Sequence, residues 1–183
     1  GVMCPGGRPF RVEGELRVAA VCQSGDWSDA EEREMDLELD ENTRHALGKA
    51  WLADAQLEHA SVAAFARLTL QLMALGAPAE LVEESQRASL DEIAHAKACF
   101  GMASRYLDGV FGPSTLRLDG ALSDLGLEAL VTSSIEEGCI GETLAAMIAG
   151  EQARVSLDAR VKQTFEQIAR DEKSGKLASL IAD

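Results

Sequence analysis

Two short stretches of this sequence contain residues that could bind a metal ion or transfer a proton. The first is D-E-I-A-H, residues 91–95, and the second is D-E-K-S-G, residues 171–175. In a helix, Glu92 and His95 are three positions apart and lie on the same face. A carboxylate and an imidazole at this spacing could ligate one ion. The second stretch repeats the acidic pair but has Gly175 where the first has His95.

Another glutamate precedes each stretch at nearly the same distance. Glu58 comes 34 residues before Glu92, and Glu137 comes 35 residues before Glu172. Each of the four interrupts an otherwise apolar stripe of a predicted helix near its middle. The chain therefore reads as a duplicated helical hairpin that carries its carboxylates at matching depths.

Four carboxylates inside one helical core would need positive charge nearby. A buried carboxylate without a partner costs several kcal/mol or takes up a proton. The helical stripes that carry these glutamates contain no Lys or Arg, so we expect two divalent ions to balance them, with His95 as a neutral donor. Iron or manganese suits this mixture of carboxylate and imidazole, zinc would tolerate it, and calcium would not favour the imidazole.

Four helices are needed to bring these residues together. The helical periodicity and the Gly and Pro positions predict their bounds as Asp40 to about Leu75, Pro78 to about Tyr106, 124–152, and from about Asp158 onward. A glycine- and proline-rich loop of roughly 18 residues separates the second helix from the third. It predicts a crossover between two helical hairpins.

The first forty residues do not share this periodicity. Residues 8–21 alternate apolar and charged residues around Glu13-Gly14, which predicts a β-hairpin. Trp27 is expected to anchor the acidic segment that follows onto the core. We divide the chain into an extension, residues 1–40, and an all-α bundle, residues 41–183.

The composition narrows the class of protein. The chain has 183 residues, of which 46% are hydrophobic and only 4% aromatic, which favours a helical core of small aliphatic residues. The net charge of −14 argues against nucleic-acid binding. No apolar run is long enough to span a membrane. Cys4 and Cys22 could form a disulfide, as in an exported protein, or remain free thiols, so the cellular compartment stays open.

The spacing of these motifs resembles the ferritin-like superfamily of carboxylate-bridged di-iron four-helix bundles, which includes rubrerythrins and bacterioferritins. The resemblance covers about residues 41–180 and implies two iron ions, with manganese as an alternative, held by five ligands: Glu58, Glu92, His95, Glu137 and Glu172. It makes Glu92 and Glu172 the bridging pair. It also implies that Asp171 holds the outward N–H of His95 and fixes its tautomer.

What the resemblance implies about function is oxidoreductase chemistry with O2 or peroxide in the bundle core. Two alternatives stay open: a ferroxidase or iron-storage protein, and a metal-free scaffold that has lost its second histidine. Gly175 is the departure from the family pattern that raises the last alternative. A homo-oligomer is also open.

Some other residues compete for a place in the site. Glu142 could replace Glu137 as the ligand from the third helix, but about 140° separates the two around an α-helix, and we prefer Glu137. His59 neighbours Glu58 and is expected to be packed or hydrogen-bonded rather than a ligand. His45, near a helix start, is expected to be solvated.

Overall fold

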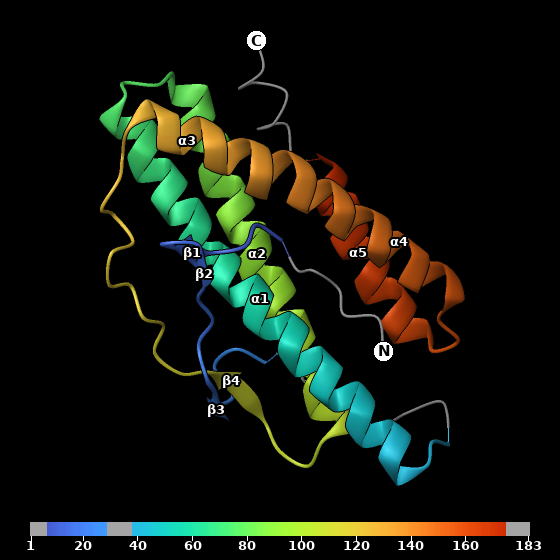
Figure 1. Cartoon of the computed structure of the whole chain (residues 1–183). Helices are drawn as coiled ribbons and strands as arrows, with labels where there is room; N and C mark the ends of the chain where they lie inside the picture. The colour runs from blue at the N-terminus through green and yellow to red at the C-terminus, as the bar shows by residue number, and fades with distance from the viewer. Residues whose placement is uncertain (1–6, 29–37, 175–183) are drawn as a thin grey trace.

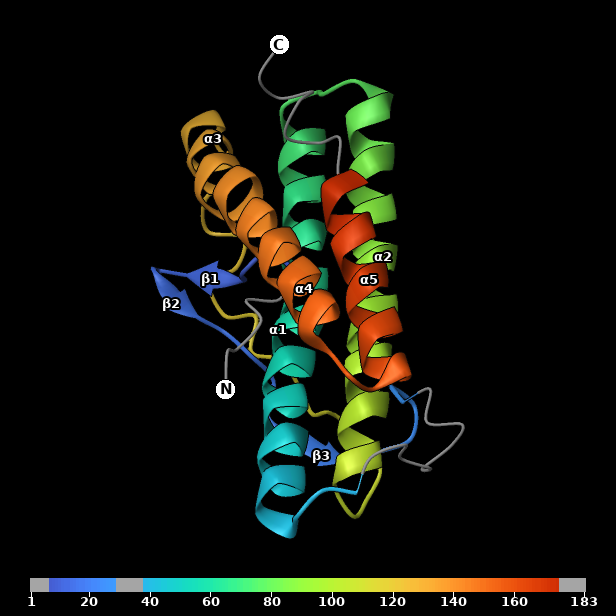
Figure 2. The same cartoon turned by 90° about the vertical axis from the view of Figure 1, so that its right-hand side faces the viewer.

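The computed structural model describes residues 7–28 and 38–174, most of which are helical. Two long helices, α1 (Glu41–Ala74) and α2 (Ala79–Tyr106), form an antiparallel pair. The crossover, residues 107–126, then leads to the second half of the chain. There α4 (Thr143–Val155) packs on α5 (Ala159–Ser174), and α5 in turn lies beside α2 (Figures 1 and 2). The predicted helical bundle in two hairpin halves is confirmed at this level.

The ends of α1 follow from its sequence. The carboxylate of Asp40 accepts hydrogen bonds from the backbone N–H of Thr43 at 3.0 Å and from its hydroxyl at 2.6 Å. This N-cap supplies a partner for an N–H that the helix itself cannot satisfy. At the other end Gly76 has a φ of +68°, a conformation that suits glycine. Pro78 follows and directly precedes α2, so both boundaries lie where the sequence predicts them.

The third helix consists of three helical segments that follow one another without a break. It comprises α3 (Leu127–Ser133), a π-helical segment η1 (Ser134–Glu142) and α4 (Thr143–Val155). The sequence predicts a single α-helix here and gives no sign of the π-helix. In a π-helix, hydrogen bonds join residues five apart, so residues five apart lie closer around the axis than in an α-helix. Such segments are frequently found at functional sites.

The extension forms two small antiparallel sheets. The predicted hairpin is present but short, with β1 (Arg11–Val12) paired to β2 (Glu15–Leu16) across a turn at Glu13 and Gly14. Both turn residues have positive φ, +53° and +79°, as two-residue hairpin loops require. The third strand, β3 (Val21–Gln23), instead pairs with β4 (Phe111–Pro113) of the crossover. The extension is thereby tied to the loop between the two helical hairpins.

Apolar clusters lie on both sides of the middle of the bundle. In one, Trp51 of α1 stacks on Phe165 of α5, with ring centroids 4.7 Å apart, and Trp27 packs against this cluster as predicted. In another, Phe10 and Val12 of the extension cover α1.

Within residues 7–28 and 38–174, no helix is both long and apolar enough to cross a membrane.

Candidate metal centre

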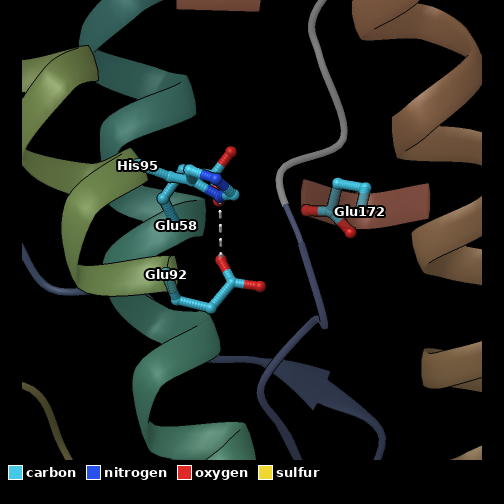
Figure 3. A group of neighbouring side chains, drawn as sticks. All are labelled: Glu58, Glu92, His95 and Glu172. Carbon is cyan, nitrogen blue, oxygen red and sulfur yellow. Dashed lines mark ion pairs between the residues drawn. The ribbon is translucent and has the colours of Figure 1, made fainter. Parts of the chain in front are cut away.

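Four of the predicted ligands converge in the middle of the bundle. Glu58 from α1, Glu92 and His95 from α2, and Glu172 from α5 each offer one ligand atom, and these atoms lie within 4.8 Å of one another (Figure 3). We call these four residues the central group. Carboxylate and imidazole donors from three helices at this separation could hold a metal ion.

Three members of the central group are buried, Glu172 is half-buried, and each of the four has a polar atom without a partner. Glu58, Glu92 and His95 are at most 4% exposed. Four of its polar atoms make no hydrogen bond: Oε2 of Glu58, Oε2 of Glu92, Nδ1 of His95 and Oε1 of Glu172. Buried polar atoms are rarely left without a partner, so four in one cluster need an explanation. A cation among them would supply it, and the residues present therefore fit a metal ion.

His95 is held in an orientation that suits a ligand. Its Nε2 donates a hydrogen bond to Oδ2 of Asp171 at 3.0 Å, which confirms the predicted contact. The side-chain amide of Gln167 donates to both Asp171 oxygens, at 2.9 and 2.8 Å, and so fixes the carboxylate. In the neutral imidazole with its proton on Nε2, Nδ1 carries the free lone pair. Nδ1 lies 3.8 Å from an oxygen of Glu58 and 4.0 Å from one of Glu92.

The crowding of carboxylates changes their acidity. Burial, followed by the charges of Glu58 and Glu172, raises the pKa of Glu92 well above its usual value. Burial, followed by Glu58 and Glu142, raises the pKa of Glu172 to about 8. Burial lowers the pKa of His95, but the carboxylates of Glu58 and Asp171 outweigh it and raise that pKa to about 9. The group therefore retains protons that a cation could displace.

The structure does not bring Glu137 into the central group. Its carboxylate instead pairs with two guanidinium groups, Nε of Arg8 at 3.4 Å and a terminal nitrogen of Arg67 at 3.3 Å. Burial raises the pKa of Glu137, and the two arginines oppose that rise. Glu137 thus has positive partners of its own, and these contacts do not favour it as a metal ligand.

Glu142 acts electrostatically on the central group, which the sequence analysis did not predict. Its charge raises the pKa of both Glu92 and Glu172. Burial raises the pKa of Glu142 itself to about 7, against the charge of Arg8. Its Oε1 is buried without a hydrogen-bond partner. The angular argument against Glu142 assumed an α-helix, and this segment is a π-helix.

Sequence reasoning missed the part that the extension plays. Arg8 is only 2% exposed and lies inside the bundle, although the helical stripes themselves supply no arginine. Gly7 approaches Glu92 so closely that a Cβ on Gly7 would lie 2.5 Å from both carboxylate oxygens. In Figure 3 the blue N-terminal trace runs beside Glu92. The glycines of η1, Gly138 and Gly141, were the one available signal, because small residues permit close approach.

The remaining candidates take the places expected of them, as far as the structure describes them. His45 is exposed. The ring of His59 packs edge-on against Trp27, with centroids 4.9 Å apart, and burial lowers the pKa of His59. Gly175 and Cys4 lie outside the described residues. Cys22 is a free cysteine in the structure, so a disulfide with Cys4 is not observed, and the consequence of the missing histidine stays untested.

Comparisons with known proteins do not assign this chain to a family. No family model, no curated protein and no solved structure matches the chain. The functional argument therefore depends on the site itself.

Proposed function

We propose that this chain is a ferritin-like metalloprotein of the oxidoreductase type, which binds iron, or manganese in its place, at the central group and reacts with O2 or peroxide. One observation carries the proposal: four side chains from three helices each bring one possible ligand atom within 4.8 Å of the others, and each also has a buried polar atom without a hydrogen bond. The resemblance of the Glu-x-x-His motif and its partner glutamates to di-iron bundles supplies the choice of metal and of chemistry.

Each residue of the site has a definable task. Glu58, Glu92 and Glu172 supply negative oxygen donors, and His95 supplies Nδ1. Asp171 keeps the imidazole proton on Nε2 and so keeps Nδ1 available. A bound redox-active ion would exchange electrons with O2 or peroxide. Glu58, Glu92 and His95 are at most 4% exposed, and this burial strengthens each electrostatic contact within the site.

Metal analysis of the purified protein tests the proposal directly. Protein from iron-supplied cells is expected to retain iron after gel filtration. Glu92→Ala is expected to abolish iron retention, because it removes a carboxylate ligand of the central group. Glu83→Ala is the matched control: it lies on the same helix with its side chain 65% exposed, and it should retain the parent amount.

Three outcomes would contradict the proposal. Many irons per chain would indicate storage, and none would indicate a metal-free scaffold. Equal metal in Glu92→Ala and the parent would show that the ligand assignment is wrong.

A further inference from the structure

Arg8 brings a positive charge from the extension into the middle of the bundle. Its Nε lies 3.4 Å from Oε2 of Glu137, and one terminal nitrogen donates to Oγ of Ser133 at 3.3 Å. The side chain also lies over the ring of Phe65, 5.8 Å from its centroid. Arg8 is therefore held from several sides, and burying such a charge is tolerated only where it is paired.

The π-helical segment is shaped to receive this arginine. A Cβ on Gly138 would lie 3.1 Å from a terminal nitrogen of Arg8 and 3.9 Å from Oε1 of Glu142. Both atoms thus border the space that glycine leaves open. Gly141 faces Pro9 in the same way, with a Cβ position 3.6 Å from the proline ring. A side chain at position 138 would therefore crowd Arg8, whereas a Cβ at position 141 would only contact the proline.

The charges in this region divide into two sets. Glu137 pairs with Arg8 and Arg67, and Oε1 of Glu142 borders the same open position at Gly138 as a terminal nitrogen of Arg8. The two guanidinium groups can therefore balance both carboxylates without any metal ion. What remains is the central group, three carboxylates and one imidazole, whose four ligand atoms lie close enough to surround a single ion.

We propose that the Arg8 guanidinium takes the position of a second metal ion beside Glu142, so that each chain binds one divalent ion tightly instead of two. The inference rests on the proposed function, because it presumes that the central group binds metal. It assigns Arg8 as a positioning residue that sets metal stoichiometry, and it makes the extension a component of the metal centre.

Titration of the full-length chain with Co2+ under anaerobic conditions tests the stoichiometry. The amount retained after gel filtration is measured by elemental analysis, and the visible Co2+ spectrum reports each addition. The parent protein is expected to retain one Co2+ per chain, and Arg8→Met two, because Glu142 and Glu137 lose a positive partner. Arg67→Met is the matched control: Arg67 also pairs with Glu137 but does not affect Glu142, so one ion is expected.

A second variant makes the test independent of whether Arg8→Met folds. Glu142→Gln is expected to retain one Co2+, because Glu142 belongs to the position that Arg8 occupies. Two ions in the parent protein, one ion in folded Arg8→Met, or loss of the ion in Glu142→Gln would each overturn the inference while leaving a metal centre in place. No ion in the parent would overturn the proposed function itself.

Discussion

Nε2 of His95 and Oδ2 of Asp171 lie 3.0 Å apart, and this contact joins α2 to α5 at the depth of the central group. Because it occupies the outward nitrogen of the imidazole, it leaves Nδ1 directed at Glu58 and Glu92. One hydrogen bond therefore both links the two halves of the bundle and selects the ligating nitrogen.

Replacing this aspartate should weaken metal binding without removing a ligand. We expect Asp171→Asn to raise the Kd for Co2+ about 10- to 100-fold, the usual cost of losing a carboxylate behind a ligating histidine. Isothermal titration calorimetry measures the change. Asp91→Asn is the matched control, since Asp91 precedes Glu92 as Asp171 precedes Glu172 but is exposed. An equal loss in both variants would contradict the assigned role.

The stability of the metal-free protein should fall as pH rises. Glu172 has a pKa of about 8 in the folded chain against a usual 4.5, and His95 about 9 against 6.5. Between its unfolded and folded pKa values, each group binds more protons in the folded state than in the unfolded state. Its contribution to the free energy of unfolding is therefore complete below the unfolded pKa and is lost as pH rises through the folded pKa. Urea unfolding from about pH 5 to pH 9 should show a loss on the order of a few kcal/mol.

A single substitution provides the control for that pH dependence. The Gln side chain in Glu172→Gln cannot ionise, so the variant should lose less unfolding free energy over the same pH range. Its loss of stability at about pH 9 should therefore be smaller than that of the parent protein. Saturating metal should also flatten the curve, because the ion displaces the same protons. A parent protein that becomes more stable between about pH 5 and pH 9 would contradict the electrostatic account.

Adding one methyl group to the extension should disturb the central group. In Gly7→Ala, the Cβ would lie 2.5 Å from both oxygens of Glu92 and 2.6 Å from Oγ of Ser61, so the extension or the carboxylate must move. We expect weaker Co2+ binding and a loss of about 1–3 kcal/mol in unfolding free energy.

Gly14→Ala separates steric crowding from backbone strain. Gly14 also has positive φ, but its Cβ would meet nothing within 4 Å. This variant should lose some stability and keep the Co2+ affinity of the parent. Unchanged affinity in Gly7→Ala would show that the extension does not support Glu92.

Periodicity and capping accounted for most of the helical framework. Asp40, Pro78 and Asp158 are helix signals with a direct physical cause, and each stands at or beside a helix start. The repeated Glu spacing likewise placed Glu58, Glu92 and Glu172 at one depth. These predictions succeeded because a regular helix fixes which residues share a face.

The predictions were incomplete where the backbone is not a regular helix. The preference for Glu137 over Glu142 assumed α-helical geometry across residues 134–142, which are π-helical. The position of Arg8 depends on how a non-periodic segment packs between helices, and no repeat in the sequence encodes that. A prediction based on helical stripes therefore found the carboxylates but missed the cation beside them.

The order in which the ligands occur along the chain has a consequence for biosynthesis. A ribosome releases α1 and α2 together with Glu58, Glu92 and His95 before it has translated α5, which carries Glu172. The nascent hairpin consequently displays three donors to solvent until the last helix docks. Metal capture by the complete set of ligands must then follow the synthesis of α5.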